Sequence, residues 1–109
     1  MKIAIYTNDL NPENIHLMPW RTIVEVAAGI RNCGHELIIY SGRNTIDLKE
    51  WHYLNIPVYE IEKLKTNNDC INLQKRIINE NVSAIYWPFA WWNIGKQKAF
   101  LKNLSIPII

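Results

Sequence analysis

Glycine is scarce in this chain, and its distribution argues against several nucleotide sites. The 109 residues include four glycines, and none of them precedes Gly29. A dinucleotide site needs glycines directly after the first strand, so that the backbone can approach the pyrophosphate. A phosphate loop of the G-x-x-x-x-G-K type is also missing from the sequence. Arg43 follows the second expected strand, where NADP enzymes place an arginine against the 2′-phosphate. Because the glycine turn is missing, Arg43 alone does not predict an NADP site.

Cysteine is also scarce, and the sequence has neither a long apolar run nor a large excess of one charge. The two cysteines, Cys33 and Cys70, have no metal-ligand spacing and fall on apolar faces of expected helices, so we expect buried free thiols in a reducing cytoplasm. No stretch approaches the ~18 apolar residues of a membrane span, and "MKIAIYT" is too short for a signal peptide. Twelve basic and ten acidic residues form no basic stripe, so nucleic acid is not an expected partner.

Apolar runs of β-forming residues alternate with stretches of helical periodicity. We expect strands at 2–6, 35–41, 56–61, 83–89 and 105–109, and helices at 19–33, 47–53, 68–79 and 93–104. Such alternation forms βαβ units, and the near-continuous strands "IAIY" and "LIIY" are typical of a parallel sheet covered on both faces. The prediction is one α/β domain, a Rossmann-like three-layer sandwich with a mostly parallel sheet in strand order 3-2-1-4-5.

The apolar strand "PII" ends the sequence without a following helix, which would leave one face of the sheet bare. We therefore expect residues 1–109 to be a single Rossmann-like domain at the N-terminal part of a longer, two-domain protein.

The connection between the first strand and the first helix spans residues 8–18, although about 2–6 residues are usual. Ligands of such sheets bind beyond the carboxyl ends of the strands, where the chain order reverses. We expect this loop and the loop at 88–92 to face each other across a crevice. Asn8 and Asp9 are candidate acceptors of hydrogen bonds from substrate hydroxyls. The alternative to a binding loop is a surface loop without a ligand, in which the Pro and Trp residues have structural roles.

Three further residues near this loop are candidates for the site. His16 is a candidate general base if it lies close to the reacting hydroxyl, and a structural hydrogen-bonding role is the alternative. Trp20 and Arg21 fall in the first helical turn, where the helix N-terminus and the guanidinium favour an anionic group of a ligand, such as a phosphate or uronate. Arg21 can instead pair with Glu13 or Glu25.

The segment "YWPFAWW" places Trp87, Phe89, Trp91 and Trp92 at the end of the fourth expected strand and just beyond it. Flat aromatic faces suit the C–H faces of sugar rings, so Trp91 and Trp92 are candidate substrate-binding residues. The same cluster fits a buried face toward another domain or partner equally well. No metal site can be assembled from neighbouring motifs.

"MKIAIYTND", a Pro-containing loop and "TIVEVAAGIRNCGHELIIYSG" together resemble the N-terminal half of GT-B glycosyltransferases, particularly family 4 or group 1. In that family the opening strand and loop precede a helix with E-x-A-x-x-L and then G-H before an apolar strand. Glu25, Ala28, Gly34 and His35 lie close to those positions. The resemblance covers about the first 42 residues, and the remainder agrees in its order of strands and helices.

The resemblance implies a division of labour between two domains. The N-terminal domain would hold a sugar or glycolipid acceptor, in the second case with peripheral contact to a membrane. The nucleotide-sugar donor would bind a C-terminal domain, without a metal ion, and no cofactor would bind the present domain. The fragment alone would lack turnover. The alternative function is a non-catalytic Rossmann-like binding or interaction domain.

Overall fold

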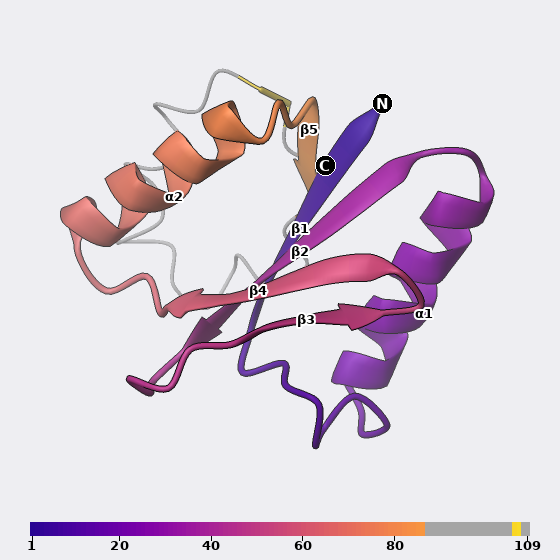
Figure 1. Ribbon diagram of the computed structural model, residues 1–109, viewed down its shortest axis with the longest axis horizontal. Coiled ribbons are helices and arrows are strands. Elements are labelled where there is room, and N and C mark those ends of the chain that lie inside the picture. The colour runs from indigo at the N-terminus through magenta and orange to yellow at the C-terminus, as the bar shows by residue number, and fades with distance from the viewer. Residues whose placement is uncertain (87–105, 108–109) are drawn as a thin grey trace.

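The computed structural model describes residues 1–86 and 106–107, and the structural statements below concern this part of the chain (Figure 1). It contains a five-stranded sheet and two long helices. In chain order the elements are β1 (Lys2–Asn8), α1 (Trp20–Asn32), β2 (Glu36–Arg43), β3 (Glu50–Tyr53), β4 (Ile56–Glu62), α2 (Asn67–Asn79) and β5 (Ala84–Tyr86).

The sheet is mostly parallel, as predicted, with the strand order β3-β4-β2-β1-β5. β1 pairs in parallel with both β2 and β5, β2 pairs in parallel with β4, and β3 pairs antiparallel with β4. The observed order differs from the predicted 3-2-1-4-5 because an additional strand, β3, lies at the edge beyond β4. The first four predicted strands keep their expected relative order, 3-2-1-4, as β4, β2, β1 and β5. The predicted helix at 93–104 and most of the predicted strand at 105–109 lie outside the described residues.

The additional strand, β3, corrects the helix that was predicted at 47–53. Leu54 and Asn55 connect β3 to β4 and both have positive φ, of 47° and 66°. A two-residue turn of this kind matches the right-handed twist of the strands and makes a tight hairpin. The exposure along Glu50–Tyr53 alternates, with Trp51 and Tyr53 half-buried and packed against the core. Alternation of this kind favours a strand over a helix.

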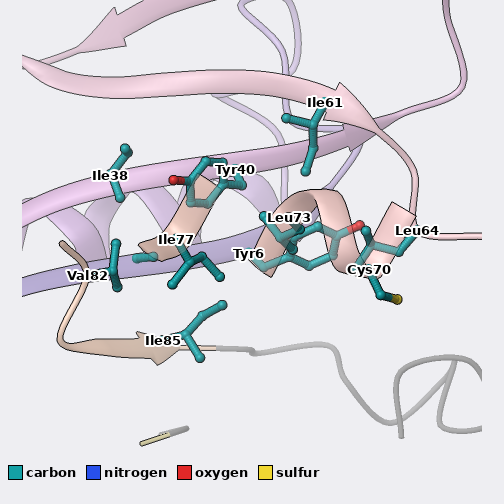
Figure 2. Close-up of a cluster of buried hydrophobic side chains, with 11 residues drawn as sticks. Tyr6, Ile38, Tyr40, Ile61, Leu64, Cys70, Leu73, Ile77, Val82 and Ile85 are labelled. Carbon is teal, nitrogen blue, oxygen red and sulfur yellow. The ribbon is translucent and has the colours of Figure 1, made fainter. Parts of the chain in front are cut away.

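Alternate side chains of the sheet pack into two separate cores, and each core includes one helix. Ala4 and Tyr6 of β1 belong to the core under α2, where Cys70, Leu73 and Ile77 are buried (Figure 2). Ile3 and Ile5 point to the opposite face, which α1 covers with three buried side chains, Ile23, Val24 and Ala27. The fold is thus α/β and compatible with a Rossmann-like arrangement.

Two local predictions need correction. Cys33 is exposed at the C-terminal end of α1, whereas Cys70 is buried as expected. The helix expected at 68–79 begins one residue earlier, at Asn67, because its N-cap is Thr66: the Thr66 side chain accepts from the Asp69 N–H, and the Asp69 carboxylate accepts from the Thr66 N–H. No helix in the described part of the chain has the length and apolar character needed to cross a bilayer.

Candidate functional site

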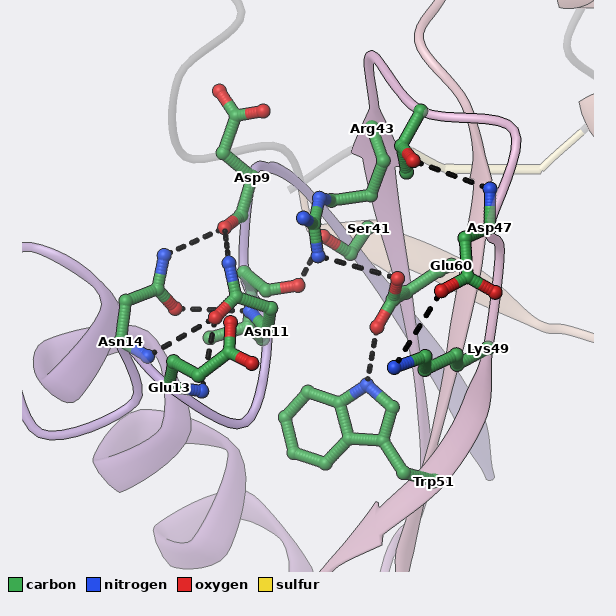
Figure 3. A network of polar contacts seen from close by, with 12 residues as sticks. Asp9, Asn11, Glu13, Asn14, Ser41, Arg43, Asp47, Lys49, Trp51 and Glu60 are labelled. Carbon is green, nitrogen blue, oxygen red and sulfur yellow. Dashed lines mark hydrogen bonds and ion pairs between the residues drawn. The ribbon is translucent and has the colours of Figure 1, made fainter.

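Asp9 stands at the carboxyl end of β1 in a backbone conformation that is tightly fixed. Its φ is +65°, in the left-handed region, which Asp adopts more readily than most residues. Its N–H donates to the Gly42 carbonyl at 2.8 Å, and its own carbonyl accepts from the side-chain amides of Asn11 at 3.1 Å and Asn14 at 2.6 Å (Figure 3). The carboxylate, nearly half exposed, lies 3.1 Å from Lys63 Nζ.

The other end of the long loop is tied to the same strand. The Trp20 indole N–H donates to the Asn8 carbonyl at 2.8 Å, so the start of α1 is held against the end of β1. The Asn8 side-chain oxygen accepts from the Tyr6 hydroxyl at 2.9 Å. Burial raises the pKa of Tyr6 well above its ordinary value, so this hydroxyl stays protonated and donates at all physiological pH values.

A buried ion pair lies at the carboxyl ends of β2 and β4. Arg43 Nη1 donates to Glu60 Oε1 at 3.2 Å, and the Trp51 indole N–H donates to Glu60 Oε2 at 3.0 Å (Figure 3). The Glu60 side chain is only 2% exposed. Both carboxylate oxygens are therefore satisfied, and the guanidinium of Arg43 is held in place from one side.

Two adjoining cavities open at this edge and share Arg43 and Thr45. The larger, of about 340 Å³, is lined by Arg43, Asn44, Thr45, Ile46, Glu62, Lys63, Lys65 and Asp69. The smaller, of about 210 Å³, is lined by Asn11, Pro12, Glu13, Arg43, Thr45, Asp47, Lys49 and Glu60. Hydrogen bonds from the backbone N–H groups of Lys65 and Thr66 outweigh the partial burial of Asp69 and lower its pKa.

The structure brings some of the predicted site residues together and separates others. Asn8 and Asp9 lie at the predicted edge, and Trp20 is bonded to Asn8. His16 and Arg21 are exposed. None of the five described candidates (Asn8, Asp9, His16, Trp20 and Arg21) lines either cavity. Arg21 pairs with Glu25 at 3.0 Å, one of the two partners considered from the sequence. Trp87, Phe89, Trp91 and Trp92 lie outside the described residues, so the second wall of the predicted crevice is not seen.

Four residues of this edge were not assigned to the site from the sequence: Arg43, Trp51, Glu60 and Lys63. Arg43 is the last residue of β2 and Lys63 directly follows β4, which is the position where parallel sheets present functional groups. The position of these two residues could therefore have been recognised from the sequence. No sequence feature pointed to Glu60 or Trp51, because their roles depend on the hairpin that pairs β3 with β4.

The arrangement offers hydrogen-bond donors and acceptors side by side. Arginine and lysine donate, carboxylates accept, and Asn44 and Thr45 do both. No group of three or more His, Cys, Asp or Glu side chains in the described part of the chain is arranged to hold a metal ion. Chemically, such an edge suits a ligand with many hydroxyl groups.

Comparison with known proteins gave no match to any protein-family model, to any curated protein or to any solved structure.

Proposed function

We propose that residues 1–109 form the acceptor-binding domain of a GT-B glycosyltransferase, which moves a sugar from a nucleotide-sugar to a sugar or glycolipid acceptor. In this proposal the chain is a Rossmann-like three-layer sandwich, the N-terminal part of a two-domain protein of the cytoplasm. The supporting observation is the half-exposed Asp9 carboxylate at the carboxyl edge of the sheet, whose partner Lys63 lines the larger of two polar cavities there.

Asp9 suits the recognition of a sugar hydroxyl for a physical reason. Its backbone is held by Gly42, Asn11 and Asn14, so the carboxylate is oriented before any ligand arrives. Pre-orientation reduces the entropy that binding must overcome. Lys63 Nζ donates to this carboxylate at 3.1 Å and so places a hydrogen-bond donor next to it. A carboxylate and an ammonium at 3.1 Å can bind the two vicinal hydroxyls of one sugar ring.

The remaining parts of the proposal come from the family resemblance. Trp20, Arg21, Trp91 and Trp92 would complete the acceptor site, and His16 would serve as general base once a donor domain closes over the loop. The nucleotide-sugar would bind that C-terminal domain, and this chain would hold no cofactor. A glycolipid acceptor would bring the edge close to a membrane surface.

Nuclear magnetic resonance titration of the ¹⁵N-labelled chain with neutral oligosaccharides tests the proposal. We expect saturable shifts of the amides of Asn8, Asp9 and Lys63 and of the Trp51 indole. The Asp9→Asn variant should weaken binding, and Glu36→Gln, a change at an exposed position on the opposite edge of the sheet, should not. Absence of saturable shifts with every glycan of a broad panel would contradict an acceptor site here.

A second candidate is a non-catalytic interaction domain, and one observation favours it. Several large apolar side chains are exposed on the two loops of this edge: Leu17, Met18, Ile46 and Leu48, with Ile46 fully exposed. Exposed apolar side chains that gather on one surface mark interfaces. Replacement of Ile46 by Ser should abolish partner capture if this candidate is right, and should leave glycan binding intact if the first is.

A further inference from the structure

The carboxyl edge of the sheet carries more negative than positive side chains, although the chain as a whole has a formal charge of +2. Four cationic side chains line the two cavities, Arg43, Lys49, Lys63 and Lys65. Five carboxylates line them as well, those of Glu13, Asp47, Glu60, Glu62 and Asp69, and Asp9 adds another.

Most of the cations are already neutralised by a carboxylate of the protein. Arg43 pairs with Glu60 at 3.2 Å, Lys63 with Asp9 at 3.1 Å and Lys49 with Asp47 at 3.7 Å. Three of the carboxylates that line the cavities, those of Glu13, Glu62 and Asp69, form no ion pair in the described part of the chain, against one such cation, Lys65. An incoming phosphate or carboxylate would therefore meet unpaired negative charge within about one Debye length, roughly 8–10 Å.

Arg43 nevertheless has donors to offer. Its Nη1 bond to Glu60 uses one side of the guanidinium, and the group has further N–H donors. Its side chain lines both cavities and is 22% exposed. Because Glu60 cancels its charge and fixes its plane, these donors suit neutral oxygen atoms better than an anion.

From these observations we infer that the acceptor of this edge is an uncharged glycan, that Arg43 is a specificity-determining residue which donates to its hydroxyls, and that Glu60 is the positioning residue of Arg43. The inference rests on the proposed function and narrows it. It also bears on Arg21, which the sequence suggested as a contact for an acceptor phosphate or uronate and which pairs with Glu25 instead.

The test compares sugars that share one ring and differ in charge. The 109-residue chain is titrated with methyl glucoside, glucuronate and glucose 6-phosphate, and binding is followed through the Trp51 indole and Arg43 side-chain N–H signals. We expect methyl glucoside to bind at least about tenfold more tightly than either anion at low salt. The gap should narrow at high salt, because screening weakens the repulsion.

Two variants separate this inference from a structural effect. Glu13→Gln/Glu62→Gln removes two of the unpaired negative charges and should reduce the tenfold preference to about twofold. The matched control Glu36→Gln/Glu80→Gln removes two carboxylates at the opposite edge of the sheet and should leave the preference unchanged. Glu60→Gln frees the charge of Arg43 and should shift the preference toward glucuronate. If Glu60 has a purely structural role, Glu60→Gln should lower the affinities for all three sugars in the same proportion. That result would overturn the positioning role of Glu60.

The outcomes also distinguish the inference of an uncharged glycan from the proposed function on which it rests. Equal or tighter binding of the anions would overturn the inference and leave a sugar-binding site standing. Failure of all three sugars and of larger neutral glycans to bind would overturn the proposed function together with the inference.

Discussion

The carboxylate of Asp9 lies 3.1 Å from the ammonium nitrogen of Lys63, although 54 residues separate them in the chain. Asp9 follows β1 and Lys63 follows β4, and β2 lies between these strands in the sheet. The ion pair therefore crosses over the end of β2, where Gly42 leaves space. Three strands are joined at one point of the candidate site.

Replacement of Asp9 by Asn should separate binding from stability. Asn tolerates the left-handed backbone, so the fold is retained, and the loss of a partly exposed ion pair changes stability by less than about 1 kcal/mol. The affinity for a neutral glycan should fall about tenfold, because a charge-assisted hydrogen bond becomes a neutral one. Calorimetric titration measures the affinity and thermal unfolding the stability. A large loss of stability would show that Asp9 mainly supports the fold.

Replacement of Gly42 by Ala should destabilise the protein. A Cβ at this position would overlap the Tyr6 hydroxyl, would lie 2.7 Å from Asn8 Oδ1 and would approach the Lys63 Cα at 3.3 Å. We expect a cost of about 1–3 kcal/mol in urea unfolding, typical of overpacking. The matched control is Gly29→Ala on α1, where nothing lies within 4 Å of the added atom. The control should stabilise the helix by up to about 1 kcal/mol.

The pair of Arg43 and Glu60 should show strong coupling in a double-mutant cycle. Arg43→Met alone leaves a carboxylate that is 2% exposed without its cation, at an expected cost of about 3–5 kcal/mol. Arg43→Met/Glu60→Gln removes both charges and should recover much of that loss. Additive effects in chemical unfolding would contradict the coupling.

Alkaline pH should unfold the protein through its buried tyrosines. Burial raises the pKa of Tyr40 to about 12, and the nearby Arg76 guanidinium only partly opposes this. The folded state therefore keeps a proton that the unfolded state releases near pH 10, so the stabilising contribution is complete below about pH 10 and is lost as the pH rises toward 12. Tyrosinate absorbance and circular dichroism should change together. Tyr40→Phe should be the more stable form at about pH 11.

Trp20→Phe should loosen the long loop without emptying the core. The variant keeps one aromatic ring and loses the five-membered ring of the indole, with the N–H that donates to the Asn8 carbonyl at 2.8 Å. We expect a stability loss of about 1 kcal/mol and faster amide hydrogen exchange in residues 9–19. The same exchange rates in both proteins would show that this hydrogen bond does not hold the loop.

The elements with strong periodicity were predictable from the sequence. The helix expected at 19–33 is found at Trp20–Asn32, and the strands expected at 2–6, 35–41 and 56–61 are found within a few residues. Their buried faces are apolar on a regular period, so local pattern and tertiary packing agree. Cys33 was misplaced because it lies at the helix end, where the buried face no longer meets the sheet.

β3 was missed because two signals competed. Asp47 and Glu50 have the spacing of a capping box, and this favoured a helix. The alternation of Trp51 and Tyr53 and the Asn at the turn favoured a hairpin, which tertiary pairing with β4 selected. The same error hid Glu60, since its buried carboxylate is satisfied by Trp51 from β3.

The edge strand itself has a consequence for behaviour in concentrated solution. β3 has four residues, and its outward-facing Glu50 and His52 are exposed. An open strand edge invites other chains to add to the sheet, and a short edge that carries a charge offers them a poor template. At this side the protein should thus resist strand-by-strand growth into aggregates.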